Sequence, residues 1–156
     1  MIRVKKEKKQ KIRVISVAVI WHQDRLFVSQ GYDPVKEEIF YRCLGGGVKF
    51  GETSQAALVR EFQEEIQAEL TQLQYLGCLE NIFTFNGELG HELMQVYQAN
   101  FVDPRFYQKA SVTFAEKKRQ KLAVWVPAPQ FESGELKLVP ENFLEFCRTA
   151  PQRKRG

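Results

Sequence analysis

The chain has 156 residues, of which 44% are hydrophobic and 27% charged, and its formal net charge is +4. This length predicts one domain with a sizeable core, and the composition is ordinary for a water-soluble fold. The apolar stretch from Val14 to Trp21 is far too short to cross a bilayer, and the basic N-terminus lacks the apolar region of a secretory signal. We therefore expect a cytoplasmic protein without a membrane span.

The cysteines favour the same compartment. Cys43, Cys78 and Cys147 are widely spaced and odd in number, which fits reduced thiols better than a disulfide framework. The sequence has no C-x-x-C pair and two histidines, so a structural zinc site is not expected.

The hydrophobic pattern predicts strands and helices in alternation. Residues 12–21 are apolar at most positions and predict a central strand, which a turn at 22–24 connects to a returning strand at 26–29. Asn86-Gly87 is a strong hairpin signal. The remaining predicted elements are a loop at 31–34, strands at 39–44, 71–79, 82–85, 91–101 and 122–126, a helix over 54–70, an irregular segment over 103–121 and a C-terminal helix from Pro140. The predicted class is α/β, with helices covering a mixed sheet.

Charge is uneven along the chain and suggests the domain limits. We expect a basic, flexible N-terminal segment at 1–11, a single domain at 12–150 and a basic tail at 151–156. Solvated tails are the favoured interpretation of these ends. The competing interpretation is that they bind a phosphate-rich partner such as RNA.

The predicted helix after the glycine run carries the most informative pattern. Gly45, Gly46 and Gly47 allow a close backbone approach, and Thr53 or Ser54 can cap the helix that follows. At about 100° per residue, four apolar side chains share one stripe and three carboxylates share the neighbouring stripe. The apolar stripe contains Leu58, Val59, Phe62 and Ile66, and the acidic stripe contains Glu61, Glu64 and Glu65.

Helix stability does not call for this crowding, because carboxylates four residues apart repel by a few tenths of a kcal/mol. Mg²⁺ does favour it, since this ion prefers oxygen ligands and retains waters that a phosphate can replace. An ordinary solvated acidic face is the competing interpretation.

Residues Gly46 to Ala68 resemble the Nudix box, whose pattern is G-x5-E-x7-R-E-U-x-E-E-x-G-U with U a bulky aliphatic. Gly46, Glu52, Arg60-Glu61, Phe62 and Glu64-Glu65 match at the required spacing. Two positions depart from the pattern, because Gln67 replaces the late glycine and Ala68 replaces the last aliphatic residue. We expect Gln67 to let the helix continue to about Leu70.

The resemblance to the Nudix hydrolase family implies a fold, an activity and a set of roles. The fold would be an α/β/α sandwich with a mixed β-sheet. The activity would be Mg²⁺- or Mn²⁺-dependent cleavage of the diphosphate linkage in a nucleoside diphosphate derivative. Arg60 would orient a box carboxylate. Glu52 would brace the loop and helix by pairing with Arg60, with Gly45 and Gly47 as structural support. The implied metal ligands are Glu61, Glu64, Glu65 and the backbone carbonyl of Gly46.

The general base and the substrate contacts are less constrained. Glu92 is the first candidate for a base outside the box, and Glu116 is the second. Each competes with the interpretation that it is an ordinary exposed glutamate. Aromatic side chains could stack on the nucleobase of a substrate, and the competing interpretation is that they only pack between strands. The candidate substrate-binding residues are Tyr32, Phe40, Arg42, Phe83 and Phe85.

Two other functions remain open at this stage. One is a catalytically silent Nudix module that binds a nucleotide, although retention of the three box glutamates argues against it. The other is a pyrophosphohydrolase acting on RNA 5′ ends, which would use the basic termini. The favoured partner is a small nucleoside diphosphate derivative. Oligomeric state is not specified by the sequence, and homodimers are common among relatives.

Overall fold

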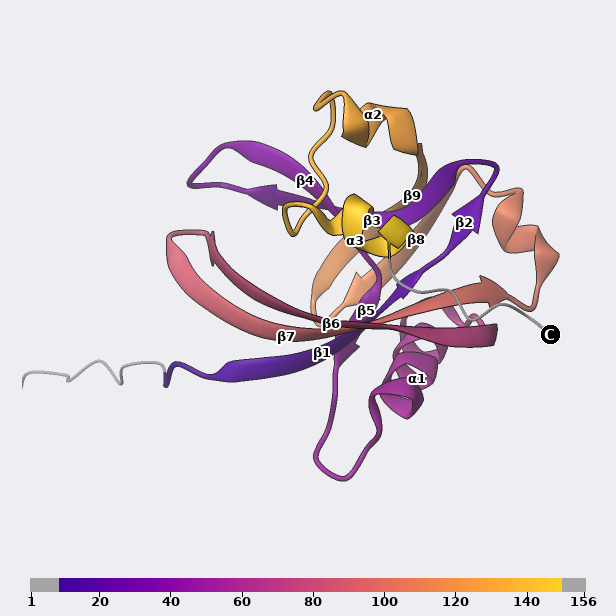
Figure 1. Cartoon of the computed structure of the whole chain (residues 1–156), viewed down its shortest axis with the longest axis horizontal. Coiled ribbons are helices and arrows are strands. Elements are labelled where there is room, and N and C mark those ends of the chain that lie inside the picture. The colour runs from indigo at the N-terminus through magenta and orange to yellow at the C-terminus, as the bar shows by residue number, and fades with distance from the viewer. Residues whose placement is uncertain (1–8, 150–156) are drawn as a thin grey trace, which may run out of the picture.

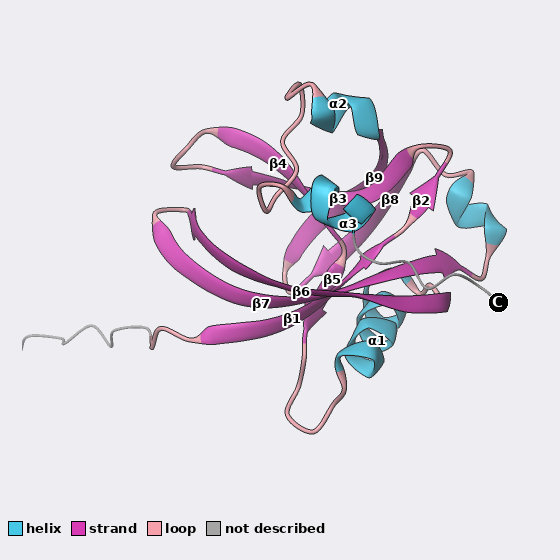
Figure 2. Ribbon diagram, viewed as in Figure 1, coloured by secondary structure: helices cyan, strands magenta, loops and turns pink. Residues whose placement is uncertain are grey.

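Two β-sheets form the centre of the fold, and helices lie on both sides of them. The computed structural model describes residues 9–149 (Figures 1 and 2). The predicted basic segments at 1–11 and 151–156 lie outside this range except for residues 9–11, which are exposed. The elements are β1 (Ile12–Val19), β2 (Trp21–His22), β3 (Arg25–Asp33), β4 (Glu38–Cys43), β5 (Gly45–Gly47), α1 (Ser54–Ile66), β6 (Leu70–Phe85), β7 (Glu88–Phe101), the 3-10 helix η1 (Pro104–Tyr107), β8 (Ser111–Glu116), β9 (Arg119–Pro127), α2 (Ala128–Glu132) and α3 (Phe143–Thr149).

Strand β1 is central, as its hydrophobic pattern predicts. It pairs antiparallel with β5 and parallel with β7, so the four-stranded sheet, of order β5-β1-β7-β6, is mixed. The second sheet has the order β2-β3-β9-β8, with β4 paired to β3. The structure thus contains two hydrogen-bonded sheets where the sequence led us to expect one.

The side chains of β1 alternate between two hydrophobic clusters. Ala18 and Ile20 lie in the cluster that α1 covers, whereas Val17 and Val19 lie in the cluster that α3 covers through Phe143. Figure 1 shows α1 below the four-stranded sheet and α2 and α3 above it. The expected α/β/α sandwich with mixed sheet pairing is present.

Two long hairpins extend from the sheets. β6 and β7 turn at Asn86-Gly87, where both residues have positive φ, so the predicted hairpin is confirmed. β6 is the edge strand of its sheet, and its register shifts between Thr71 and Gln74 and between Tyr75 and Gly77. β3 and β4 form the second hairpin.

Two predicted loops are in fact strands. Gly31 to Asp33, predicted as a loop, continue β3, and the turn follows at 34–37. The predicted irregular segment at 103–121 contains η1 and the β8–β9 hairpin. β8 buries Phe114 and partly buries Val112, and this single alternating pair in a polar segment is too short a pattern to identify a strand from the sequence.

Helix α1 ends at Ile66, so its predicted continuation to about Leu70 is wrong. Gln67 takes the left-handed conformation, with φ 50° and ψ 41°, and its N–H bonds to the Gln63 carbonyl at 3.2 Å. The Ala68 N–H bonds to the Phe62 carbonyl, which closes the helix end. The family pattern has glycine at position 67 because glycine adopts this conformation without strain.

We predict that Gln67→Gly stabilises the protein by roughly 0.5 to 1 kcal/mol, because it removes the strain of a side chain at positive φ. Loss of the hydrogen bond from the Gln67 side chain to the Glu64 carbonyl, 3.1 Å, offsets part of the gain. Urea unfolding measures the difference. Gln63→Gly, in the exposed helix interior, is the control and should lose about 1 kcal/mol. A loss at both positions would contradict this account.

Candidate active site

The glycine run is a short strand against β1 rather than a simple strand end. Gly46 pairs with Ser16, and Gly45 pairs with Val17. A Cβ on Gly46 would lie 2.6 Å from each carboxylate oxygen of Glu61, closer than non-bonded atoms can approach. Glycine at position 46 therefore allows the Glu61 carboxylate to rest directly on the backbone of β5.

The start of α1 is fixed by two hydroxyls with different partners. Thr53 Oγ1 accepts a hydrogen bond from the Ala56 N–H at 3.1 Å, so Thr53 is the N-cap. Ser54 Oγ instead lies 2.6 Å from the hydroxyl of Tyr97, on β7. These contacts fix the helix start over the four-stranded sheet.

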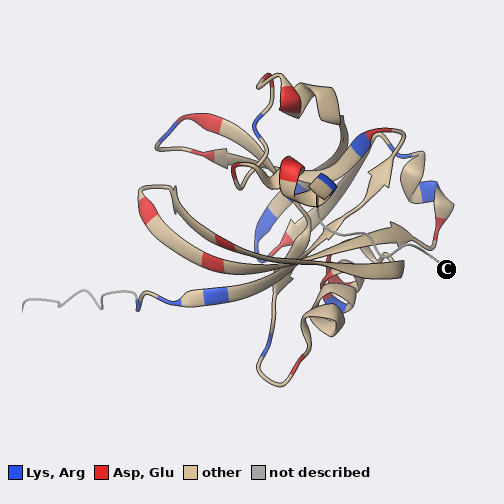
Figure 3. Cartoon of the chain, in the orientation of Figure 1, with Lys and Arg blue, Asp and Glu red and all other residues tan. Residues whose placement is uncertain are grey.

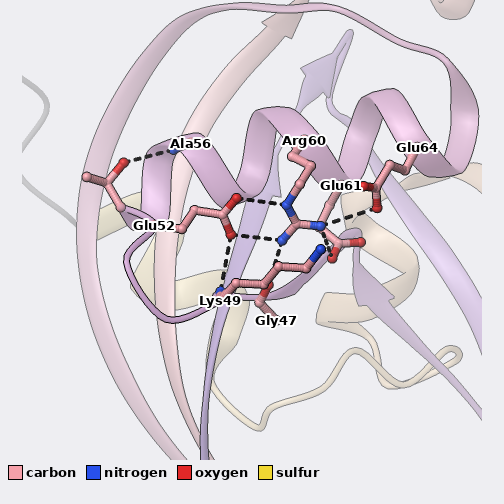
Figure 4. A network of polar contacts seen from close by, with 8 residues as sticks. Gly47, Lys49, Glu52, Ala56, Arg60, Glu61 and Glu64 are labelled. Carbon is pink, nitrogen blue, oxygen red and sulfur yellow. Dashed lines mark hydrogen bonds and ion pairs between the residues drawn. The ribbon is translucent and has the colours of Figure 1, made fainter.

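The Arg60 guanidinium connects α1 to the loop that precedes it (Figure 4). It donates two hydrogen bonds to the Glu52 carboxylate, at 2.8 and 2.9 Å, so the expected pairing of these residues is confirmed. It also donates to the Gly47 carbonyl at 3.0 Å, to Glu61 at 3.0 Å and to Glu64 at 3.2 Å. The hydrogen bonds from Arg60, with one from the Lys49 N–H, lower the pKa of Glu52 to about 2 even though burial opposes the shift.

Glu61 is linked to both of the other box glutamates. It lies beside Glu65, and it accepts a hydrogen bond from the same Arg60 nitrogen as Glu64, whose side chain is 56% exposed. Over residues 9–149, no three His, Cys, Asp or Glu side chains are grouped closely enough to hold a metal ion as they stand. The convergence expected from the helical wheel is therefore present for Glu61 and Glu65 but not for Glu64.

Glu65 opens onto a small cavity of about 70 Å³ between β1, β4, β5 and β8. The acidic residues that line it come from distant parts of the chain and include both candidate bases, Glu92 and Glu116. Glu92 is 3% exposed and accepts a hydrogen bond from Arg42 at 3.3 Å. Glu116 pairs with Lys121 at 2.6 Å. Arg13, Arg42 and Lys121 supply the positive charge of the cavity wall.

The crowding of acidic groups changes the protonation of Glu65. Burial, the negative charges of Glu116 and Glu61, and a hydrogen bond to Glu61 raise the pKa of Glu65 from 4.5 to about 8, and Lys121 opposes the shift. The Glu65 carboxyl group is thus held close to the carboxylates of Glu61 and Glu116, which repel its negative charge. A cation bound between these groups would relieve the repulsion.

The proposed substrate contacts fall around this cavity rather than in one pocket. Phe40 and Phe85 face each other edge to face, with ring centroids 5.8 Å apart. Phe83 lies across Gly90 of the neighbouring strand, and Tyr32 is 55% exposed. Arg42 lines the cavity itself.

A family comparison decides what kind of site this is. The NUDIX domain model matches residues 11–146, which is most of the chain. The chain belongs to the Nudix hydrolase family. The matched range includes Gly46 to Ala68, the segment that resembles the Nudix box, and the Arg60 contacts lie within this segment. No functionally curated protein matches the chain.

Solved structures support the fold of this Nudix hydrolase. A NUDIX hydrolase from Nitrosomonas europaea is 18% identical, with a TM-score of 0.60 over 88% of this chain and 87% of the other. A MutT NUDIX hydrolase from Burkholderia pseudomallei is 23% identical, with a TM-score of 0.56 over 77% and 86%. A MutT protein from Bacillus halodurans is 13% identical, with a TM-score of 0.59 over 90% and 84%. Within residues 9–149, no helix is long and apolar enough to span a membrane.

Several residues of the site were not found from the sequence. Arg13 and Lys121 line the cavity. In the sequence, Arg13 resembles an ordinary strand residue, and Lys121 belongs to a charged segment predicted as irregular. Ser16 is fully buried in β1, paired with Gly46, and its hydroxyl has no hydrogen-bond partner in the part of the chain that the structure describes. A serine inside an apolar strand is a signal that the sequence does offer, because a buried hydroxyl normally has a partner.

We predict that the metal-free protein loses stability as pH rises from about 5 to about 8 because of Glu65. Since its pKa is raised on folding, the folded state binds more protons than the unfolded state in this range, and the free energy of unfolding falls with increasing pH. Urea unfolding in chelator at several pH values measures the slope. Glu65→Gln should flatten it, whereas the exposed control Glu69→Gln should not. Equal slopes in all three proteins would show that Glu65 titrates normally.

Proposed function

We propose that this Nudix hydrolase cleaves the diphosphate linkage of a nucleoside diphosphate derivative in the cytoplasm, with Mg²⁺ or Mn²⁺ as cofactor. One observation carries the proposal: Glu61 rests on Gly46 and contacts Glu65, at the edge of a cavity that three cationic side chains also line. Carboxylates suit a hard divalent cation, and arginine and lysine suit phosphate oxygens.

The residues around Gly46 fit such an ion. Glycine lets the Glu61 carboxylate lie against the Gly46 backbone, the donors are all oxygens, and the buried Ser16 hydroxyl has no hydrogen-bond partner within residues 9–149. Glu61, Glu65 and the Gly46 carbonyl would hold the ion. Glu64 would join them by turning away from Arg60, which is an easy movement for a side chain that is 56% exposed.

When bound, the metal neutralises the diphosphate oxygens and makes a bound water more acidic. The protein supplies positioning around it. Arg60 holds Glu61 through a hydrogen bond of 3.0 Å, which fixes one ligand in place. Arg13, Arg42 and Lys121 would bind the diphosphate oxygens from the cavity wall.

Glu92 is the favoured general base. It is buried in the cavity wall, and Arg42 orients its carboxylate through a hydrogen bond of 3.3 Å. It would accept the proton of the attacking water. Glu116 also lines the cavity and is the second candidate, although its bond to Lys121 at 2.6 Å occupies one oxygen.

Activity on a panel of nucleoside diphosphate derivatives, with Mg²⁺ or Mn²⁺, tests the proposal. We predict that Glu64→Gln lowers turnover on the order of 10²-fold or more, because it removes a metal ligand. Its fold should survive, since an exposed ion pair contributes about 1 kcal/mol or less. Glu69→Gln, an exposed glutamate just beyond the box, is the matched control. Unchanged turnover in Glu64→Gln would remove Glu64 from the metal site.

A second pair of variants assigns the base. We predict that Glu92→Gln lowers kcat by about 10²- to 10⁴-fold while metal affinity is retained, and that Glu116→Gln has a much smaller effect. Glutamine preserves an acceptor for Arg42, so the cavity wall should stay intact. Metal affinity is measured by Mn²⁺ titration. The reverse order of the two kcat effects would make Glu116 the base.

The panel also separates the two alternative functions. A silent nucleotide-binding module would bind panel compounds without releasing phosphate. An RNA 5′-end pyrophosphohydrolase would act on triphosphorylated RNA in preference to free nucleotides. The basic segments that motivate the RNA alternative lie mostly outside residues 9–149, and no contact among the described residues favours it over a small nucleotide.

A further inference from the structure

The β3–β4 and β6–β7 hairpins, which both project to the left in Figure 1, are joined at their tips. The joining residue is Asp33, at the end of β3, which is 3% exposed. One of its carboxylate oxygens accepts hydrogen bonds from the N–H groups of Val35 and Lys36, at 3.0 and 3.1 Å. The other accepts from the N–H of Asn86, in the opposite hairpin, at 3.3 Å.

Lys36 completes this tip contact. Its ammonium group donates to the Thr84 carbonyl of β6 at 2.8 Å and lies 3.9 Å from Asp33. Burial alone would raise the pKa of Asp33, but the hydrogen bonds from Lys36, Asn86 and Val35 outweigh it and lower the pKa. The carboxylate is therefore charged near neutral pH, so the tip contact is maintained there.

Two neighbouring chambers lie beside the joined hairpins. Phe40 of β4 packs edge to face against Phe85 of β6, and Phe40 lines both chambers. One chamber, of about 380 Å³, is also lined by Phe83 and Arg42. The other, of about 500 Å³, is also lined by Phe85 and Lys121.

Each chamber shares one cationic side chain with the acidic cavity. Arg42 lines both the smaller chamber and the cavity, and Lys121 lines both the larger chamber and the cavity. A diphosphate in the cavity would therefore lie between Arg42 and Lys121, with the smaller chamber beyond Arg42 and the larger chamber beyond Lys121. Figure 3 shows acidic positions on the β6–β7 hairpin.

We propose that Asp33 is a positioning residue that holds the Phe40–Phe85 pair as a partition, so that the two groups joined by the diphosphate occupy separate chambers. This inference rests on the proposed function and narrows its substrate class. The preferred substrate carries a sizeable group on both sides of the diphosphate, such as a nucleoside on one side and a sugar on the other. A nucleoside triphosphate would fill one chamber and leave the other empty.

The partition depends on the tip contact because Asp33 and Lys36 join the β3–β4 hairpin to the β6–β7 hairpin there. Without Asp33, the Asn86 N–H loses its acceptor and the Phe40–Phe85 contact loses its support. Binding then has to order the hairpins as well as the substrate, which weakens affinity. The metal ligands and both candidate bases are untouched, so the effect should appear in KM rather than kcat.

The experiment compares Asp33→Ala and Lys36→Met with Glu37→Gln, which removes a charge from the same turn at an exposed residue. The first readout is hydrogen exchange at the Asn86 amide in the full chain without substrate. We expect exchange about tenfold faster in Asp33→Ala, a smaller increase in Lys36→Met and no change in Glu37→Gln. Lys36→Met keeps the test decisive if Asp33→Ala fails to fold, because Lys36 is half exposed.

The second readout is KM and kcat for ADP-glucose and for ATP. Asp33→Ala should raise KM for ADP-glucose about tenfold and KM for ATP less than about threefold, with kcat within about twofold for both. Unchanged exchange at Asn86, equal KM increases for both compounds, or a loss of kcat at unchanged KM would each overturn the proposal. The proposed function fails only if no nucleoside diphosphate derivative of the panel is hydrolysed. If neither ADP-glucose nor ATP is hydrolysed, dissociation constants from calorimetry replace KM, and equal weakening of both compounds overturns the partition.

Discussion

The rest of the site depends on the contact between Arg60 and Glu52. Two hydrogen bonds of 2.8 and 2.9 Å join the guanidinium to the carboxylate, and a third reaches the Gly47 carbonyl. Helix and loop are thereby fixed as one unit, with Gly46 directly beneath Glu61. Planar arginine–carboxylate pairing is well suited to this role because it constrains direction as well as distance. The carboxylates of α1 can then be crowded together without moving the backbone that carries them.

The local parts of this arrangement could be predicted from the sequence. The spacing of Glu52, Arg60 and Glu61 within the Nudix box was sufficient to anticipate the Glu52–Arg60 pair, and helical periodicity identified the buried face with Leu58 and Phe62. These features depend on residues close together in the chain, where 3.6 residues per turn determines which side chains are neighbours. The Asn86-Gly87 turn was predictable for the same reason, because its backbone geometry depends on two residues.

The parts that join distant segments could not be predicted in this way. Glu92 meets Arg42 because β7 and β4 flank one cavity, and nothing in the sequence reports that proximity. β8 was missed because a polar edge strand resembles a loop. The end of α1 was predicted wrongly for a different reason. Glutamine is a good helix former, whereas the chain reversal after Ile66 imposes the left-handed conformation on Gln67. At such positions the tertiary structure overrides the intrinsic helix propensity of the residue.

The two register shifts in β6 have a consequence for how copies of this protein meet. A straight strand of 16 residues at a sheet edge would expose a long row of unpaired backbone groups, on which a second molecule could build an intermolecular ladder. Bulges near Gln72 and Gly77, both at positive φ, bend and twist that row. The edge therefore offers no long flat template, and the hairpin keeps its length without becoming a nucleus for aggregation.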